Sequence, residues 1–327
     1  MRILMTGATG FIGRRMLDFL TSENSNEIIC LLRPKSEAEK LPRKDNIKII
    51  RTSFEAQELL TAMNEIDVVI HLAGQMGVPG VTYEQFYEVN CNLTSKLVDA
   101  AVERKVKQFI YCSTPGVLGF GKRLAAEDEP YAPRNDYEKT KMEAEKIVRQ
   151  QCRDTDTKYT IIRPDFVYGP GDTRRIGMYK LIRDKHFILT TSGKSYLHPT
   201  YIDDVIQGFI CAMLNENAFD QTLNIAAKKD VTSKDYLNTI AECTDSRLIQ
   251  LNIGIRLSHF CAGVIDGLWR RLFHKEGFVT KNRIDFLAMD HSSSIKKAKD
   301  LMGYNPEYSC KDGMKRTIQW AKENNLL

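Results

Sequence analysis

The chain has 327 residues, 43% of them hydrophobic and 27% charged, and carries a formal net charge of +5. This composition indicates a globular protein with room for a sizeable core. Because the basic excess is spread along the sequence, we expect no nucleic-acid partner. The eight cysteines include no C-x-x-C pair, so we expect neither a metal site nor a disulfide framework.

Several cysteines lie within apolar runs, as is typical of proteins from a reducing compartment. No apolar run reaches the length of a membrane span, and the first strand begins at Met1 itself. We therefore expect a cytoplasmic protein without a signal peptide.

The first thirteen residues predict a nucleotide site. Residues 1–5 are expected to form a buried strand, and residues 6–13 (TGATGFIG) then lead into an amphipathic helix. Backbone N–H groups at a helix N-terminus attract phosphate, and glycines let it approach the chain closely. The alternative is a tight strand–helix turn without a ligand. The residues predicted to hold a dinucleotide here are Gly7, Thr9, Gly10, Phe11, Ile12 and Gly13.

Short apolar runs alternate with amphipathic stretches as far as residue 165. Strands are expected at 28–32, 47–50, 68–70, 109–111 and 159–162, and helices at 54–63, 83–103 and 137–152. This alternation predicts an α/β fold with a doubly wound parallel sheet of the Rossmann type. We expect a dinucleotide-binding domain over 1–165, with returns near 200–226, and a smaller, interleaved C-terminal substrate lobe over 166–327. Residues 222–226 are expected as one more strand of the first sheet.

The end of the second strand predicts which dinucleotide binds. An NAD site carries an acid there to bond the ribose 2′-hydroxyl, whereas this chain has Arg33 and Lys35. A 2′-phosphate is the better electrostatic match, so NADP(H) is favoured over NAD(H). The alternative is that Arg33 only covers the adenine.

The next strand ends in Leu72, Ala73 and Gly74, whose small side chains would let the dinucleotide lie against the chain. His71, inside the apolar strand, is interpreted as a core residue rather than a base. Asn90, within an expected helix, is interpreted as a brace for a neighbouring loop.

A catalytic group is predicted where the strand at 109–111 ends in Ser113 and Thr114. Tyr137 and Lys141 follow, four residues apart on a helix and therefore on one face. An ammonium group and a positive nicotinamide ring would favour the phenolate of the tyrosine and bring its pKa toward neutral pH. A hydroxyl of Thr114 or Ser113 could hold the substrate oxygen.

Seven stretches together resemble the extended short-chain dehydrogenase/reductases, the NAD-dependent epimerase/dehydratase family. They are residues 6–13, 69–74, 111–114, 137–141, 163–172, 198–205 and 297–306. The resemblance implies that Tyr137 is the general acid/base, that Lys141 binds the nicotinamide ribose, and that Thr114 positions the substrate oxygen beside Ser113. It also implies that Pro164 and Val167 line the nicotinamide and that the protein is a homodimer.

Two departures from the family pattern bear on the adenine contacts and on the substrate, in that order. An acid near the adenine is replaced by residues 51–54 (RTSF), and the Phe-Asn of many sugar epimerases by Asp165-Phe166. The pattern is closest to the 3β-hydroxysteroid dehydrogenase and dihydroflavonol reductase branch. It predicts an NAD(P)-dependent oxidoreductase that interconverts a ketone and a secondary alcohol on a small-molecule substrate. The alternatives are a nucleotide-sugar epimerase or dehydratase that retains its cofactor, and a non-catalytic dinucleotide-binding protein.

For two features of the C-terminal half the sequence leaves alternatives open. His198 either contacts substrate or braces a loop. Residues 255–273 are expected to form an amphipathic helix with a basic end that includes His274 and Lys275. We interpret this helix as a lid on the pocket, with peripheral membrane contact and a dimer seam as the alternatives.

Overall fold

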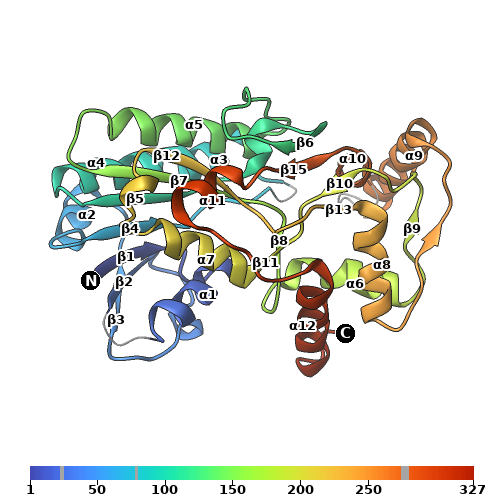
Figure 1. Cartoon of the computed structure of the whole chain (residues 1–327), viewed down its shortest axis with the longest axis horizontal. Coiled ribbons are helices and arrows are strands. Elements are labelled where there is room, and N and C mark those ends of the chain that lie inside the picture. Colours follow the sequence, from blue (N-terminus) through green and yellow to red (C-terminus); the bar gives the residue numbers. More distant parts are fainter. Residues whose placement is uncertain (23–25, 78–79, 274–279) are drawn as a thin grey trace.

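A seven-stranded parallel sheet forms the centre of the molecule, as the alternating pattern predicts (Figure 1). The computed structural model describes residues 1–22, 26–77, 80–273 and 280–327, without the side chains of residues 269, 270, 272 and 273. The strand order is β3-β2-β1-β4-β5-β7-β12, so the direction of winding reverses between β1 and β4. The strands are β1 Arg2–Thr6, β2 Glu27–Leu32, β3 Ile47–Arg51, β4 Val68–His71, β5 Gln108–Cys112, β7 Lys158–Pro164 and β12 Gln221–Ile225.

Helices cover both faces of this sheet, which explains why its strands are continuous apolar runs. Along β1, Ile3 and Met5 face one core, while Leu4 faces the other. In Figure 1, α1 and α7 lie on one face and α2, α4 and α5 on the other. These helices are α1 Phe11–Leu20, α2 Ala56–Ala62, α4 Leu93–Glu103, α5 Asp136–Gln151 and α7 Ile202–Ala212. The predicted doubly wound α/β fold is confirmed.

The expected helix at 83–103 is interrupted. It begins as α3 (Tyr83–Tyr87), passes through a π-helical turn at Glu88–Asn92 and continues as α4. Such a turn inserts one extra residue into the helical repeat, often at a functional site. Here it brings Asn90 to a buried position, 1% exposed.

The C-terminal half contributes both to the central sheet and to a second, smaller sheet. β12 pairs in parallel with β7, so the expected return of residues 222–226 to the first sheet is confirmed. The second sheet has the order β13-β10-β15-β6, and the sequence pattern did not predict it. Its strands are β6 Lys122–Ala125, β10 Tyr196–Leu197, β13 Val231–Thr232 and β15 His291–Ser293. The remaining elements are β8 Val167–Tyr168, β9 Ile188–Leu189, β11 Thr200–Tyr201, β14 Ile249–Gln250, α6 Ile176–Arg183, α8 Ser233–Cys243, α9 Ile255–Phe273, α10 Lys281–Ala288, α11 Lys296–Met302 and α12 Cys310–Glu323.

The helix expected at 255–273 is present as α9, at the end of the molecule opposite β3 (Figure 1). His274 and Lys275, counted above in its basic end, lie outside the described residues. Among the described helices, none is long and apolar enough to cross a bilayer.

Candidate active site

The glycine turn after β1 is shaped for a ligand with phosphate groups. Gly7 has φ +73°, and a Cβ there would lie 2.6 Å from the backbone nitrogen of Ala73. A Cβ on Gly13 would lie 2.1 Å from the carbonyl oxygen of Gly7, so the start of α1 packs directly on the turn. No side chain caps α1 at Gly10, which leaves its first N–H groups for an anion. These residues fit the pyrophosphate of a dinucleotide.

A cleft of about 1200 Å³ extends from this turn along the carboxyl ends of the sheet strands. Its volume exceeds the range typical of small-ligand pockets and leaves room for a dinucleotide and a substrate together. The following residues predicted above line it: Gly7, Thr9, Gly10, Phe11, Ile12, Gly13, Arg33, Leu72, Ala73, Gly74, Ser113, Thr114, Tyr137, Lys141, Pro164 and Val167.

His198 does not line the cleft. It is 2% exposed, and its Nε2 lies 2.8 Å from the carbonyl oxygen of Ala227. Burial lowers its pKa, with the Ala227 carbonyl acting in the opposite direction. Its position matches the loop-bracing alternative rather than substrate contact.

The end of the cleft beyond β2 is basic. Arg33 and Lys35 line a hollow of about 730 Å³ beyond β2, in which Glu37 is the one acid among the described lining residues. The Glu37 carboxylate forms an ion pair with Lys40. Arg51 donates from Nη1 to the carbonyl oxygens of Arg33, Pro34 and Ser36, at 3.3, 2.5 and 3.0 Å, and so fixes the loop that carries both basic residues.

Asn90 fixes the loop that follows β4. Asn90 Oδ1 accepts from the backbone N–H of Gln75 at 2.8 Å, and Asn90 Nδ2 donates to the carbonyl of Gln75 and to Thr140 Oγ1. The interpretation of Asn90 as a loop brace is therefore confirmed. His71 is fully buried between the hydroxyls of Thr6 and Thr94, and burial lowers its pKa to about 3, as expected of a neutral core residue.

Tyr137 lies in the first turn of α5, which begins where Asn135 Oδ1 accepts from the backbone N–H of Glu138 at 2.9 Å. Burial raises the pKa of the Tyr137 phenol above its usual value. Cys112 and Glu138 add to the rise, and Arg174 opposes it. The phenol is therefore protonated at neutral pH in this structure. The expected stabilisation of the phenolate by Lys141 and a nicotinamide ring stays a prediction.

Lys141 is 4% exposed and is directed at the end of β5. Its Nζ donates to the carbonyl oxygen of Cys112 at 2.6 Å and lies 4.1 Å from the centre of the Tyr111 ring. Burial lowers its pKa to about 8. The ammonium is thus held in the cleft wall by the end of β5, which Ser113 and Thr114 directly follow.

Thr114 follows β5 and caps the short helix Pro115–Leu118. Its Oγ1 accepts from the backbone N–H of Gly116 at 3.2 Å. A hydroxyl that accepts through its oxygen still has its hydrogen to donate. Thr114 can therefore donate a hydrogen bond to an oxygen placed in the cleft.

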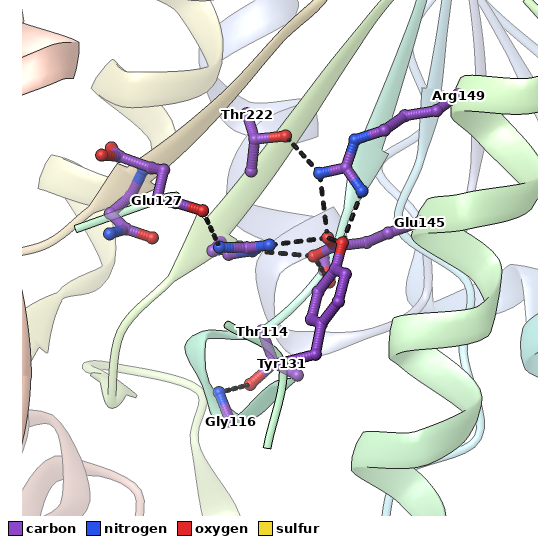
Figure 2. A network of polar contacts seen from close by, with 10 residues as sticks. Thr114, Gly116, Glu127, Tyr131, Glu145, Arg149 and Thr222 are labelled. Atoms are coloured by element: carbon purple, nitrogen blue, oxygen red, sulfur yellow. Dashed lines mark hydrogen bonds and ion pairs between the residues drawn. The ribbon is translucent and has the colours of Figure 1, made fainter. Parts of the chain in front are cut away.

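A buried ionic network lies behind this strand end, drawn in Figure 2. Glu145, fully buried one helical turn after Lys141, accepts from Arg163 at 2.7 and 2.8 Å, from Tyr131 at 2.7 Å and from Ser113 Oγ at 2.6 Å. Burial alone would raise the Glu145 pKa, but the bonds from Arg163 and its neighbours bring it below the usual value. Ser113 lines the cleft, but its hydroxyl is committed to Glu145.

Sequence reasoning assigned no role to Glu145. A sequence signal existed, because Glu145 stands four residues after Lys141 on the same helix face. Its partner Arg163 comes from β7, eighteen residues further on.

The far end of the cleft has aromatic walls. Phe120 stacks on His291 with ring centres 4.8 Å apart, and Phe286 lies 4.7 Å from Phe166. Burial lowers the pKa of His291 to about 4, so this ring is neutral. Asp165 accepts from Ser293 Oγ at 2.6 Å, and burial raises the Asp165 pKa to about 7.

Arginines also line the cleft, but each of those described here already faces an acid. Arg134 Nη2 lies 2.9 Å from Asp285, and Arg174 Nε lies 2.6 Å from Asp172. Arg175 lies 3.2 Å from the same Asp172 carboxylate. The sequence pattern alone does not predict these ion pairs. Arg134 and Asp285 are far apart in sequence, and the two pairs with Asp172 lie within a short loop that no periodicity defines.

Comparisons with known proteins agree with this geometry. Residues 3–226 match the model of the NAD dependent epimerase/dehydratase family. The chain is 25% identical to the sterol-4-alpha-carboxylate 3-dehydrogenase (decarboxylating) of Candida albicans, over 98% of each protein. It is 23% identical to the N-acetyl-alpha-D-glucosaminyl-diphospho-ditrans,octacis-undecaprenol 4-epimerase of Escherichia coli O157:H7, over 99% of this chain and 97% of that protein.

A solved structure shares the fold. The UDP-glucuronic acid 4-epimerase of Bacillus cereus, in complex with UDP-glucuronic acid and NAD, superposes with a TM-score of 0.78 at 23% identity, covering 99% of this chain and 100% of that one. The fold, the glycine turn and the family match agree, and the resemblance to the extended short-chain dehydrogenase/reductases is confirmed. This chain belongs to the NAD dependent epimerase/dehydratase family.

Proposed function

We propose that the protein interconverts a ketone and a secondary alcohol on an organic substrate, with a nicotinamide dinucleotide held across the glycine turn. The observation that carries this proposal is the convergence of Thr114 and Tyr137, from different elements, on one cleft that begins at that turn. The buried Lys141 lines the same cleft.

The roles follow from the state of each group. The dinucleotide supplies or accepts a hydride when bound. Thr114 donates a hydrogen bond to the substrate oxygen, and Tyr137, protonated because burial raises its pKa, gives that oxygen a proton during reduction. Lys141 binds the ribose hydroxyls, and its charge favours the phenolate that remains.

The preferred cofactor is NADP(H). This is supported by Arg33 and Lys35 beside the hollow beyond β2, and by the absence of an acid at the described end of β2. The solved Bacillus cereus enzyme was captured with NAD, so the two dinucleotides must be compared directly.

A second candidate is epimerisation of a nucleotide sugar, in which the hydride returns to the substrate. The arginines that line the cleft favour it, because they could bind a diphosphate. Two observations favour net oxidation or reduction instead. Arg134, Arg174 and Arg175 already face carboxylates, and the walls around them are aromatic. The names of the two relatives favour neither reaction, because one is a dehydrogenase and the other an epimerase.

The test combines mass analysis of the dinucleotide that co-purifies with the protein and a turnover assay. Ring ketones and nucleotide sugars are each incubated with the protein and dinucleotide, and reduced nicotinamide is followed by absorbance. Net consumption of NADPH with a ketone supports the proposal. Conversion of a nucleotide sugar without net change in nicotinamide supports the second candidate. If the protein binds neither dinucleotide, both proposed reactions are rejected. The alternative of a non-catalytic dinucleotide-binding protein is then rejected as well.

A further inference from the structure

Helix α9 is inverted relative to an ordinary surface helix. Its inward face carries Ser258 and Ala262, each 1% exposed, while its outward face carries large apolar side chains. Globular proteins place the apolar stripe of such a helix against the core. The exposed fractions of the outward residues are Phe260 69%, Leu268 56%, Leu257 49%, Val264 47% and Ile265 44%.

Polar contacts hold α9 in this orientation. Ser258 Oγ donates to the carbonyl oxygens of Gly254 and Thr190, at 2.8 and 3.2 Å. His259 Nε2 lies 2.8 Å from Asp285 Oδ1 on α10. The side chains that anchor the helix are on its polar face. The apolar face therefore points away from the rest of the protein.

The lid interpretation does not fit this arrangement. The described residues that line the cleft include Asp285 and Phe286 of α10 but none of α9. Helix α9 therefore lies outside α10, one layer away from the cleft. The outward side chains of α9 therefore do not contact a ligand in the cleft.

The charges beside the apolar face are basic. Arg256 and Arg271 are exposed on α9, and Lys281 of α10 runs alongside, since a Cβ on Gly263 would lie 3.5 Å from its Cε. The one acid among the described residues of α9 is Asp266, which is half-buried and has an interaction partner. An apolar stripe with basic flanks is the pattern of a helix that lies in the interface of an anionic membrane.

From this pattern we infer that the outward face of α9 docks on the surface of a bilayer containing anionic lipids. A second copy of the chain fits less well. A symmetric contact through this face would bring the two sets of Arg256, Arg271 and Lys281 toward each other. The inference does not depend on the reaction that the cleft performs.

The test is co-sedimentation of the full chain with vesicles of phosphatidylcholine alone and of phosphatidylcholine with phosphatidylglycerol. Binding is expected only with phosphatidylglycerol and should weaken as salt is raised. Phe260→Glu should lower the partition coefficient at least roughly tenfold, since it removes a buried aromatic side chain from the contact. Arg256→Glu combined with Lys281→Glu should abolish the preference for anionic vesicles.

The matched control is Ile49→Glu on β3, which is 40% exposed and lies at the opposite end of the molecule (Figure 1). It should bind vesicles like the unmodified chain, and thermal unfolding verifies that each variant is folded. The inference is overturned if the unmodified chain stays in the supernatant with both vesicles. Equal binding by Phe260→Glu and Ile49→Glu also overturns it. So does a lipid-free dimer, seen by analytical ultracentrifugation, that Phe260→Glu dissociates while vesicle binding is absent.

Discussion

The Ser113 hydroxyl donates to the carboxylate of Glu145 at 2.6 Å, joining the end of β5 to the helix that carries Tyr137 and Lys141. Figure 2 shows the same carboxylate at the centre of contacts from Tyr131 and Arg149. The cleft wall therefore depends on a charge that has no access to water.

Replacing that charge should be costly. Glu145→Gln leaves the buried guanidinium of Arg163 without a counter-charge, so we expect a loss of ~3–5 kcal/mol in the free energy of unfolding, measured with urea. Glu143→Gln on the same helix, whose carboxylate meets exposed Lys146, is the control and should cost under ~1 kcal/mol. Similar losses for the two variants would show that the network adds nothing beyond a surface pair.

The role of Tyr137 can be separated from its packing. Tyr137→Phe keeps the ring beside Phe86, 6.3 Å away, but removes the proton donor. Turnover should fall ~10²–10⁴-fold, while dinucleotide affinity, measured by isothermal titration calorimetry, stays nearly unchanged. Loss of dinucleotide binding would instead mean that the residue is structural.

Cofactor choice should respond to Arg33. Arg33→Asp removes a guanidinium from the hollow beyond β2 and supplies an acceptor for a ribose 2′-hydroxyl. The ratio of NADP(H) to NAD(H) affinity should fall by ~10–100-fold. Arg43→Asp makes the same charge change at an exposed position outside the cleft and should leave the ratio alone. If both variants behave alike, the 2′-phosphate assignment is wrong.

Asp165 should make stability depend on pH. Burial raises its pKa from 3.8 to about 7, so the folded chain holds a proton that the unfolded chain loses near pH 4. The contribution of the protonated Asp165 carboxyl to the free energy of unfolding is complete below that pH and is lost as pH rises toward 7. Asp165→Asn should therefore raise the melting temperature by a few degrees at pH 8 and have little effect at pH 4. The exposed Asp45→Asn is the control, and an equal gain at both pH values would contradict the assignment.

The glycine turn gives a steric prediction. Gly13→Ala places a methyl 2.1 Å from the carbonyl oxygen of Gly7, so the turn must open and dinucleotide affinity should fall sharply. Gly267→Ala, with nothing within 4 Å of the added carbon, should be neutral or stabilise by up to ~1 kcal/mol. Equilibrium dialysis and chemical denaturation measure the two effects. Unchanged binding by Gly13→Ala would exclude the turn from the site.

Features that depend on local sequence could be predicted. The turn at Gly7–Gly13 follows from a strand, three glycines and a helix in succession, and the shared cleft of Tyr137 and Lys141 follows from one helical turn. The periodicity of residues 255–273 likewise defined an apolar stripe and the bounds of α9.

Features that depend on distant pairing could not be predicted. Asp165 meets Ser293 across 128 positions, and Arg134 meets Asp285 across 151. The orientation of α9 depends on contacts with Thr190 and Asp285, so periodicity revealed the stripe but not which way it faces. His198 was ambiguous for the same reason, because the carbonyl of Ala227 that it meets lies 29 residues away.

The pairing of β12 with β7 has a consequence for biosynthesis. The edge of the central sheet stays open until residues 221–225 have left the ribosome, because no earlier segment takes the place of that strand. By then the other six strands of that sheet have already been made. The central sheet therefore takes its final form only after the segments between β7 and β12, with β8, β9, β10 and β11 among them, have also been synthesised.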